Sequence, residues 1–147
     1  MIATLCYLEK DNKYLMLYRN KKEIDINKGK WIGVGGKMEK GETPEQCLIR
    51  EVWEETGYTL NNYEYRGIVI FNYNEDDPLF MYVYTSSNFS GIEKECNEGD
   101  LKWIPKDEIL DLKLWEGDKI FLKLLFENSP FFYLTLNYEN DNVVSSK

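Results

Sequence analysis

Three glutamates between Gly36 and Tyr58 have the spacing of side chains that share one face of a helix. Glu51, Glu54 and Glu55 stand at positions i, i+3 and i+4, which are neighbours on a helical surface. Like charges so placed repel by only about 0.2–0.5 kcal/mol per pair, so a solvated acidic face is one interpretation. The other is a divalent-cation site, because Mg²⁺ binds through a few carboxylates and keeps water and substrate phosphates in its remaining positions.

Apolar residues beside the cluster favour the cation site. Cys47, Leu48 and Val52 continue the glutamate-bearing side of the helix, so we expect part of the cluster to lie at the boundary of the core. Carboxylates held at such a boundary need cations. The sequence has no histidine, which excludes imidazole ligands and the Ser/His and Cys/His nucleophile pairs. Catalysis must therefore rest largely on carboxylates.

The sequence also signals where this helix begins and ends. Thr43 is a candidate N-cap, Pro44 suits the first helical position, and Gln46 stands where a capping-box partner bonds back to the N-cap amide. Gly57 follows the last turn and can adopt the left-handed conformation that ends a helix. The pattern therefore predicts a short helix between these caps.

The segment from Gly36 to Tyr58, which contains this helix, resembles the Nudix box. The pattern of that box is G-x5-E-x7-R-E-U-x-E-E-x-G-U, in which U is a bulky aliphatic residue. Gly36, Glu42 and the run 50–57 match all seven fixed positions, and only Tyr58 departs, with an aromatic ring in place of an aliphatic side chain. The resemblance implies a pyrophosphohydrolase that splits a nucleoside diphosphate linked to some further group. It also implies the α/β fold of the family, an α/β/α sandwich with a mixed central sheet.

Similarity continues outside the box, over residues 29–37, 98–103 and 114–118, and reaches about Leu125. These segments are similar to the MutT-type branch of the family, which sanitises oxidised purine nucleoside triphosphates. That branch supplies a further metal-binding glutamate from a later loop, which falls on Glu98 in this sequence. A solvated loop acid is the alternative interpretation of Glu98.

The vertebrate members of that branch read the purine with a tryptophan and two adjacent acids. This sequence offers Trp115 and Asp118, with Gly117 in place of the other acid. A second departure is Ile32, which stands where an asparagine commonly contacts the base. The resemblance therefore supports the phosphate chemistry more strongly than a preference for oxidised guanine.

Charge and resemblance together assign roles to the acidic residues. We expect Glu51, Glu54 and Glu55 to be the principal ligands of Mg²⁺, with Mn²⁺ as the alternative ion, and Glu98 to be an additional ligand or a base. Arg50 lies four residues before Glu54, a spacing suited to an ion pair that orients this carboxylate.

Four residues near the start of the box keep two interpretations each. Glu42 either binds metal through water or braces the loop before the helix. Lys37 either meets a phosphate oxygen or is solvated. Gly35 and Gly36 either let the backbone approach a ligand closely or serve the geometry of a turn.

Aromatic residues could form a pocket for the base of a nucleotide. The candidates for stacking are Trp31, Phe71, Tyr82 and Trp115, although each of them, taken alone, is more often a core residue. Asp118 also has two interpretations. It is either the N-cap of a helix over residues 118–127 or, if it faces a buried purine edge, a carboxyl that desolvation keeps protonated and able to donate a hydrogen bond.

Length and charge limit the class of protein. The 147 residues fit one domain, over residues 1–137, followed by a loose tail at 138–147. The net charge of −8 argues against binding to a nucleic-acid polymer, whereas a small nucleotide stays compatible where metal ions screen the acidic site. Three cysteines without framework spacing indicate reduced thiols in a cytoplasmic protein. The apolar run 2–8 is too short to span a membrane, and the sequence leaves the oligomeric state open.

Apolar and β-rich runs predict the strands that must position these residues. We expect strands over residues 2–8, 14–18, 31–34, 63–73, 79–87, 101–104 and 131–136, with a hairpin turn at Asp11–Lys13. A helical turn is expected over 105–110, and apolar residues that recur on one face predict a helix over 118–127. Strands on both sides of a helix fit a mixed sheet layered between helices.

These expectations converge on a Mg²⁺-dependent hydrolase of nucleoside triphosphates. Oxidised purines such as 8-oxo-dGTP are the candidate substrates, with a nucleoside monophosphate and pyrophosphate as products. Two alternatives stay open. One is a hydrolase of another diphosphate, such as a nucleotide sugar or a dinucleoside polyphosphate, and the other is a nucleotide-binding regulator without turnover.

Overall fold

The computed structural model describes residues 1–139 and 142–146 of the chain. The strands and helices expected from the sequence are present, except that the strand expected over residues 31–34 is divided at Gly33 into two strands with different partners, and one further strand follows at the C-terminal end. In chain order the elements are β1 (Ile2–Lys10), β2 (Lys13–Arg19), β3 (Trp31–Ile32), β4 (Val34–Lys37), α1 (Pro44–Thr56), β5 (Tyr58–Tyr73), β6 (Leu79–Gly91), β7 (Gly99–Pro105), α2 (Lys106–Ile109), α3 (Glu116–Phe126), β8 (Phe132–Glu139) and β9 (Asn142–Ser146).

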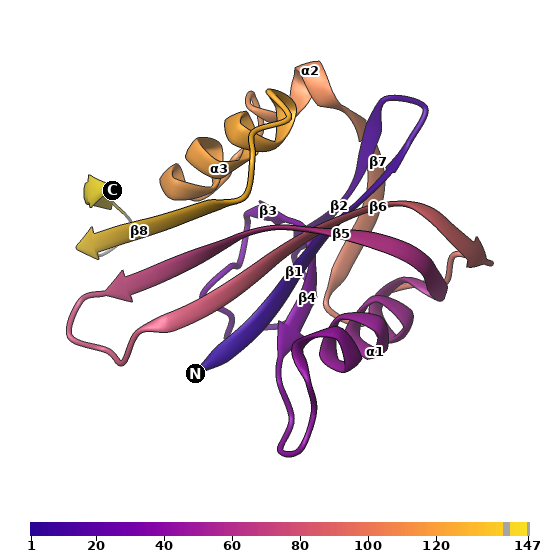
Figure 1. Ribbon diagram of the computed structural model, residues 1–147, viewed down its shortest axis with the longest axis horizontal. Coiled ribbons are helices and arrows are strands. Elements are labelled where there is room, and N and C mark those ends of the chain that lie inside the picture. The colour runs from indigo at the N-terminus through magenta and orange to yellow at the C-terminus, as the bar shows by residue number, and fades with distance from the viewer. Residues whose placement is uncertain (140–141, 147) are drawn as a thin grey trace.

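The strands of the described residues form one mixed sheet. Its order is β3-β2-β1-β6-β5-β8-β9, with β4 paired to β1 and β7 paired to β2. The β1–β6 and β5–β8 pairs are parallel, whereas the others are antiparallel. Figure 1 shows α1 on one side of the sheet and α2 and α3 on the opposite side. The predicted α/β/α sandwich with a mixed central sheet is confirmed.

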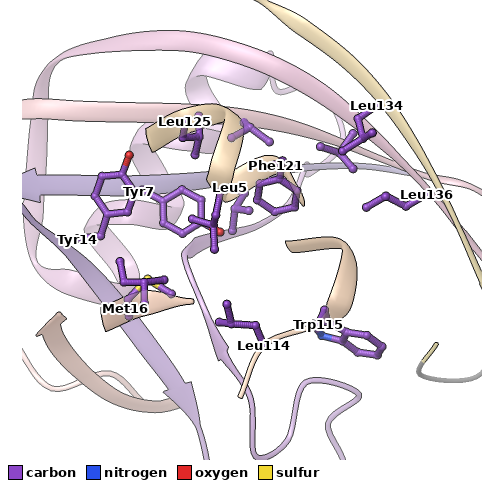
Figure 2. Packing of buried hydrophobic residues seen from close by; sticks show 14 of the residues in the cluster. Leu5, Tyr7, Tyr14, Met16, Leu114, Trp115, Phe121, Leu125, Leu134 and Leu136 are labelled. Carbon is purple, nitrogen blue, oxygen red and sulfur yellow. The ribbon is translucent and has the colours of Figure 1, made fainter. Parts of the chain in front are cut away.

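Alternate residues of the central strands fill two separate cores. In β1, Leu5 and Tyr7 face the core beneath α3, whereas Cys6 and Leu8 face the core beneath α1. Figure 2 shows the first of these cores, in which Phe121 of α3 packs against the sheet. Burial on both faces explains why β1 is an almost unbroken apolar run instead of an alternating one.

Helix α1 begins and ends as predicted. Thr43 accepts a hydrogen bond from the Gln46 backbone N–H at 3.2 Å, and the Gln46 side chain accepts one from the Thr43 N–H at 2.9 Å. Gly57 has a φ of 84° and ends the helix in the left-handed conformation. Leu48 and Val52 are fully buried beneath the helix, which fixes its rotation and turns the glutamates toward the edge of the core.

The sequence pattern underestimates two strands. The predicted hairpin turn is confirmed, with positive φ at Asp11 (53°) and Asn12 (60°). However, β5 and β6 extend beyond 63–73 and 79–87, and the rings of Tyr58 and Phe89 pack edge-on at 5.0 Å to join their outer ends. Three register shifts in this pair interrupt the two-residue alternation that marks a strand.

The start of α3 corrects the N-cap prediction for Asp118. Trp115 is the N-cap residue, the helix begins at Glu116, and Asp118 is buried in its first turn. The backbone N–H of Gly117 donates a hydrogen bond to the Tyr138 hydroxyl at 2.7 Å. This contact requires glycine, because a Cβ atom on residue 117 would lie 2.6 Å from the hydroxyl oxygen. Gly117 therefore permits the helix to start at Glu116. None of the described helices is both long and apolar enough to cross a membrane.

The structure also differs from the loose tail expected at 138–147. Tyr138 is buried at the end of β8, and the backbone of β9 pairs antiparallel with β8 up to Ser146. Residues 140, 141 and 147 lie outside the described residues. The polar composition of the segment hides this strand, because its formation depends on the unpaired backbone edge that β8 presents.

Candidate active site

Helix α1 lies against β4, and two of the glutamates contact two glycines there. The backbone N–H of Gly35 donates a hydrogen bond to Glu55 Oε1 at 2.8 Å. A Cβ atom on Gly36 would lie 2.5 Å from the carboxyl carbon of Glu51. Because β4 is held by antiparallel pairing with β1, the strand fixes both carboxylates. Close packing against neighbouring protein groups therefore explains glycine at both positions.

The guanidinium of Arg50 holds the acidic residues together. Its Nε donates to Glu42 Oε2 at 2.6 Å, and its Nη1 donates to Glu51 Oε1 at 2.7 Å and to Glu54 Oε2 at 3.1 Å. A further ion pair of 3.0 Å joins Nε to Glu39 Oε1. The predicted ion pair between Arg50 and Glu54 is confirmed, and one cation orients four carboxylates.

Glu42 braces the loop that precedes α1. Its carboxylate accepts hydrogen bonds from two guanidinium nitrogens of Arg50, at 2.6 and 2.9 Å, and from the backbone N–H of Glu39 at 2.8 Å. These bonds, with Arg50 as the main cause, lower the pKa of Glu42 to about 2. Both carboxylate oxygens are engaged, so the contacts favour the bracing role over a metal contact through water.

The deepest part of the cluster joins α1 to the loop before β7. One oxygen each of Glu55 and Glu98 and the sulfur of Cys96 lie within 4.8 Å of one another. Glu55 is only 5% exposed, and its Oε2 has no hydrogen-bond partner among the described residues. Burial, followed by the contact with Glu98, raises the pKa of Glu55. Without a cation, burial and the neighbouring Glu98 therefore favour the protonated form of the Glu55 carboxyl.

Two basic residues, one at the end of β2 and one in the loop that follows it, contact Glu98 from the other side. Lys22 Nζ lies 2.7 Å from Glu98 Oε1, and Arg19 Nη1 lies 3.8 Å from Oε2. The hydrogen bonds from Glu55 and Lys22 lower the pKa of Glu98. The structure thus brings the predicted loop glutamate to the same site as the helix glutamates.

The carboxylates fit a divalent cation that prefers oxygen ligands. Their exposure differs widely, from 49% for the Glu54 side chain to 17% for Glu51, and Glu55 is almost fully buried. The cluster is thus accessible to solvent at Glu54 and desolvated at Glu55. The unpartnered Oε2 of Glu55 is an acceptor that a hard cation would satisfy.

Trp115 is held by specific contacts on the opposite side of the sheet. Its Nε1 donates to Asn27 Oδ1 at 2.8 Å, and Lys30 Nζ lies 4.2 Å from its ring centroid. The rings of Tyr73 and Tyr138 pack edge-on against it at 6.0 and 5.4 Å. The residue is thus part of the core and also carries polar contacts from the loop before β3.

Asp118 is buried close to Lys30 and Tyr7. Desolvation raises the pKa of Asp118 to about 8, and the charge of Lys30 acts in the opposite direction. Burial, and then the charge of Asp118, raises the pKa of Tyr7, whose hydroxyl has no hydrogen-bond partner among the described residues. Below about pH 8 the Asp118 carboxyl therefore carries a proton that it can donate.

The structure does not bring all the predicted base-binding residues together. Phe71 and Trp31 pack at the edge of the core that contains Trp115, whereas Tyr82 packs at the core on the opposite face of the sheet. There Tyr82 stacks on another tyrosine ring at 5.7 Å, so it is wrongly grouped with the other three. Trp31 packs against Tyr18 at 5.0 Å.

Lys37 is exposed at the end of β4, and its carbonyl oxygen accepts a hydrogen bond from Arg50 at 3.3 Å.

The sequence did not indicate three residues of the site, namely Lys22, Asn27 and Cys96. All three lie outside the named strands and helices and reach at least one partner across a long sequence separation, which is 76 positions for the Lys22–Glu98 pair. No local pattern indicates such contacts.

A family model described as the NUDIX domain matches residues 1–125. The chain is 29% identical over 141 residues to the uncharacterized Nudix hydrolase YvcI of Bacillus subtilis strain 168, which covers 92% of this chain and 85% of that protein. It is 28% identical over 127 residues to the oxidized purine nucleoside triphosphate hydrolase of Danio rerio, which covers 86% of this chain and 81% of that protein.

Solved structures agree with the family model. The mutator MutT protein from Bacillus halodurans superposes with a TM-score of 0.89 at 30% identity, over 99% of this chain and 95% of that one. The fold and the carboxylate site thus define an enzyme class that generally uses divalent metal ions and acts on small nucleotides. The chain belongs to the Nudix family and is a Nudix hydrolase with a MutT-like fold.

Proposed function

We propose that this enzyme is a Mg²⁺-dependent pyrophosphohydrolase of nucleoside triphosphates, with Mn²⁺ as an alternative ion and a nucleoside monophosphate and pyrophosphate as products. The observation that carries the proposal is the row of carboxylates on α1, which ends in the buried and unpartnered Glu55 Oε2. The similarity to the oxidized purine nucleoside triphosphate hydrolase of Danio rerio supports a triphosphate substrate.

Glu51, Glu54, Glu55 and Glu98 would hold the cation. A divalent cation bound to them polarises a phosphoryl oxygen and lowers the pKa of bound water. The chain's own contribution is positioning. Arg50 orients Glu51 and Glu54, the Gly35 N–H orients Glu55, and the other end of the site is fixed by the basic partners of Glu98.

The base would bind on the side of the sheet that carries Trp115 and Asp118. Because the Asp118 carboxyl is protonated below about pH 8, it can donate a hydrogen bond to an acceptor on a purine edge. Ordinary and oxidised purines both offer such an acceptor, so the proposal of oxidised purines such as 8-oxo-dGTP as substrates is supported by the similarity to the Danio rerio enzyme. The Asp118→Asn and Asp118→Ala variants, assayed on several nucleotides, should show altered ratios of kcat/KM between bases, and unchanged ratios would reject this part of the proposal.

A substrate panel with product identification and a Mg²⁺ titration tests the reaction. The expected result is Mg²⁺-dependent release of pyrophosphate from a nucleoside triphosphate. Preferential cleavage of a nucleotide sugar or a dinucleoside polyphosphate would replace the proposed substrate class. Tight nucleotide binding without turnover would instead indicate a regulator. The free state of all three cysteines fits the reducing cytoplasm, which we propose as the location.

A further inference from the structure

Cys96 lies at the buried end of the carboxylate site and has no role in the proposed reaction. The residue is 3% exposed, and its sulfur is grouped with one oxygen of Glu55 and one of Glu98 within 4.8 Å. Cys96 and Gly99 form an isolated bridge, which closes the loop and holds the sulfur toward the two carboxyls. The position of the thiol is thus set by the backbone.

Basic residues near this sulfur would balance the charge of a metal-bound thiolate. The positive charges of Lys22 and Arg19, which contact Glu98, would partly balance a site that holds two carboxylates and one thiolate.

A second observation points to a ligand at this place. The Glu55 carboxyl is 5% exposed and its Oε2 is unpartnered among the described residues. One oxygen of the same carboxyl lies within 4.8 Å of the Cys96 sulfur and of an oxygen of Glu98. A buried acceptor of this kind needs a proton or a cation. Two oxygens and one sulfur are three protein ligands, the number that zinc sites with an open fourth position use.

We infer that Cys96 supplies a sulfur ligand to this site, so that the enzyme binds Zn²⁺ and other thiophilic divalent cations there in addition to Mg²⁺. Sulfur prefers such ions, whereas Mg²⁺ binds oxygen almost alone. The inference rests on the proposed function in one respect, namely that Glu55 and Glu98 hold the catalytic cation. Binding would release the thiol proton to solvent.

Binding of Zn²⁺ requires the three ligand atoms to move only slightly closer together. Tetrahedral Zn²⁺ binds sulfur at about 2.3 Å and carboxylate oxygen at about 2.0–2.2 Å, which places neighbouring ligand atoms roughly 3.5 Å apart. The three atoms now lie within 4.8 Å of one another. Because the Glu98 side chain is 27% exposed, it can move, and its solvent-facing side provides a path for the ion. A Zn²⁺ ion bound there would compete with Mg²⁺ for the same oxygens.

Titration of the whole protein with Co²⁺, a spectroscopic substitute for Zn²⁺, tests the inference. The wild type should develop a thiolate-to-cobalt charge-transfer band, and the Cys96→Ser variant should lack it. Zn²⁺ affinity, measured by competition with a chelating dye, should fall about 10-fold or more in Cys96→Ser, while Mg²⁺ affinity should change by less than about 3-fold. An unchanged band and unchanged Zn²⁺ affinity in Cys96→Ser would overturn the inference.

Cys6→Ala is the matched control, because Cys6 is buried in the core beneath α1 and is absent from the ligand group. This variant should keep the cobalt band. If Cys96→Ser does not fold, X-ray absorption of the Zn²⁺-loaded wild type tests by itself whether sulfur is a ligand of the ion. One sulfur at about 2.3 Å supports the inference, and a shell of nitrogen and oxygen only overturns it.

Mg²⁺-dependent hydrolysis by the wild type is measured in parallel, which separates this inference from the proposed function. Hydrolysis without a sulfur-to-metal band would overturn the inference and leave the proposed function intact. A band without hydrolysis of any nucleotide would support the sulfur ligand and contradict the proposed function.

Discussion

Arg50 connects acidic side chains that would otherwise repel one another. It lies 2.6–3.1 Å from carboxylate oxygens of four glutamates, which are Glu39, Glu42, Glu51 and Glu54. A lysine at this position would keep the positive charge but lose the planar fork of donors that reaches several carboxylates at once. The role of this residue therefore depends on its shape as well as its charge.

We expect Arg50→Lys to lower the free energy of unfolding by about 1–2 kcal/mol and kcat/KM by roughly 10-fold or more, because Glu51 and Glu54 lose their orientation. Urea unfolding and hydrolysis assays measure the two effects. Arg66→Lys is the control, since the hydrogen bonds of Arg66 to the described residues go to neutral groups, namely Thr85, Asn128 and the backbone carbonyl of Leu125. Wild-type stability and activity in Arg50→Lys would refute the role assigned to Arg50.

Asp118 should make stability depend on pH. Its pKa is about 8 in the folded protein and 3.8 as the ordinary value, so between these values the folded state binds more protons than the unfolded state. The contribution of Asp118 to stability therefore falls as pH rises from about 4 to about 8. Asp118→Asn cannot ionise, so it should gain stability relative to wild type across this range. Urea unfolding at several pH values tests this, and parallel curves for the two proteins would contradict it.

At the scale of elements, the contact between β4 and α1 makes two adjacent glycines respond differently to substitution. A Cβ atom on Gly36 would meet the end of the flexible Glu51 side chain at 2.5 Å. A Cβ atom on Gly35 would meet the backbone oxygen of Thr4 at 2.0 Å, and the residue has a φ of 153°. The first clash can be relieved by moving a carboxylate, whereas the second requires movement of β1.

We expect Gly36→Ala to fold with near wild-type stability but to lose Mg²⁺ affinity and activity by roughly 10-fold or more, because Glu51 is displaced. Gly35→Ala should instead be destabilised by about 2 kcal/mol or more. Thermal unfolding and Mg²⁺ titration distinguish the two variants. If Gly36→Ala keeps full Mg²⁺ affinity, the position assigned to Glu51 is incorrect.

The same elements show which structural features local sequence can predict. Helix α1 follows from signals within a few residues, because its caps, apolar positions and acidic face are all local. The contacts that complete the site are not local. Glu55 binds Gly35 twenty residues away, and Glu98 reaches its partners through a loop whose only sequence signal is its resemblance to the family pattern.

At the scale of the molecule, the two faces of the sheet decide which residues can act together. Phe71 and Tyr82 are both half-buried aromatic residues on neighbouring strands, yet they face opposite cores. The sequence identifies both residues as candidates for stacking on a base. The register and bulges between β5 and β6 determine toward which face of the sheet each ring points. Spacing alone leaves Asp118 as either an N-cap or a buried carboxyl, because the close contact of Gly117 with Tyr138, which lets the helix start earlier, cannot be inferred from it.

The C-terminal strand gives a prediction at this scale. Residues 126–146 extend past the matched NUDIX region, and β9 protects the edge of β8. Removal of residues 140–147 should lower the free energy of unfolding by roughly 2 kcal/mol, the net value of a few strand hydrogen bonds, and favour aggregation. Urea unfolding measures the loss against a control that lacks only residue 147. Equal unfolding midpoints would show that β9 contributes nothing.

We propose that Glu55 is retained as a buried carboxyl for metal binding although it lowers the stability of the metal-free fold. Glu55→Gln retains an acceptor for the Gly35 N–H and gains an N–H₂ group that can donate to Glu98, so the fold loses no contact while the cost of burying an ionisable carboxyl is removed. Glu45→Gln, on the same helix but outside the cluster, is the control.

The most direct measurement is therefore the thermal midpoint of metal-free Glu55→Gln together with its Mg²⁺-dependent turnover of nucleoside triphosphates. We predict a midpoint at or above that of the wild type and turnover lowered by at least about 100-fold. Near wild-type turnover in a well-folded Glu55→Gln protein would contradict the assignment of this carboxylate to catalysis.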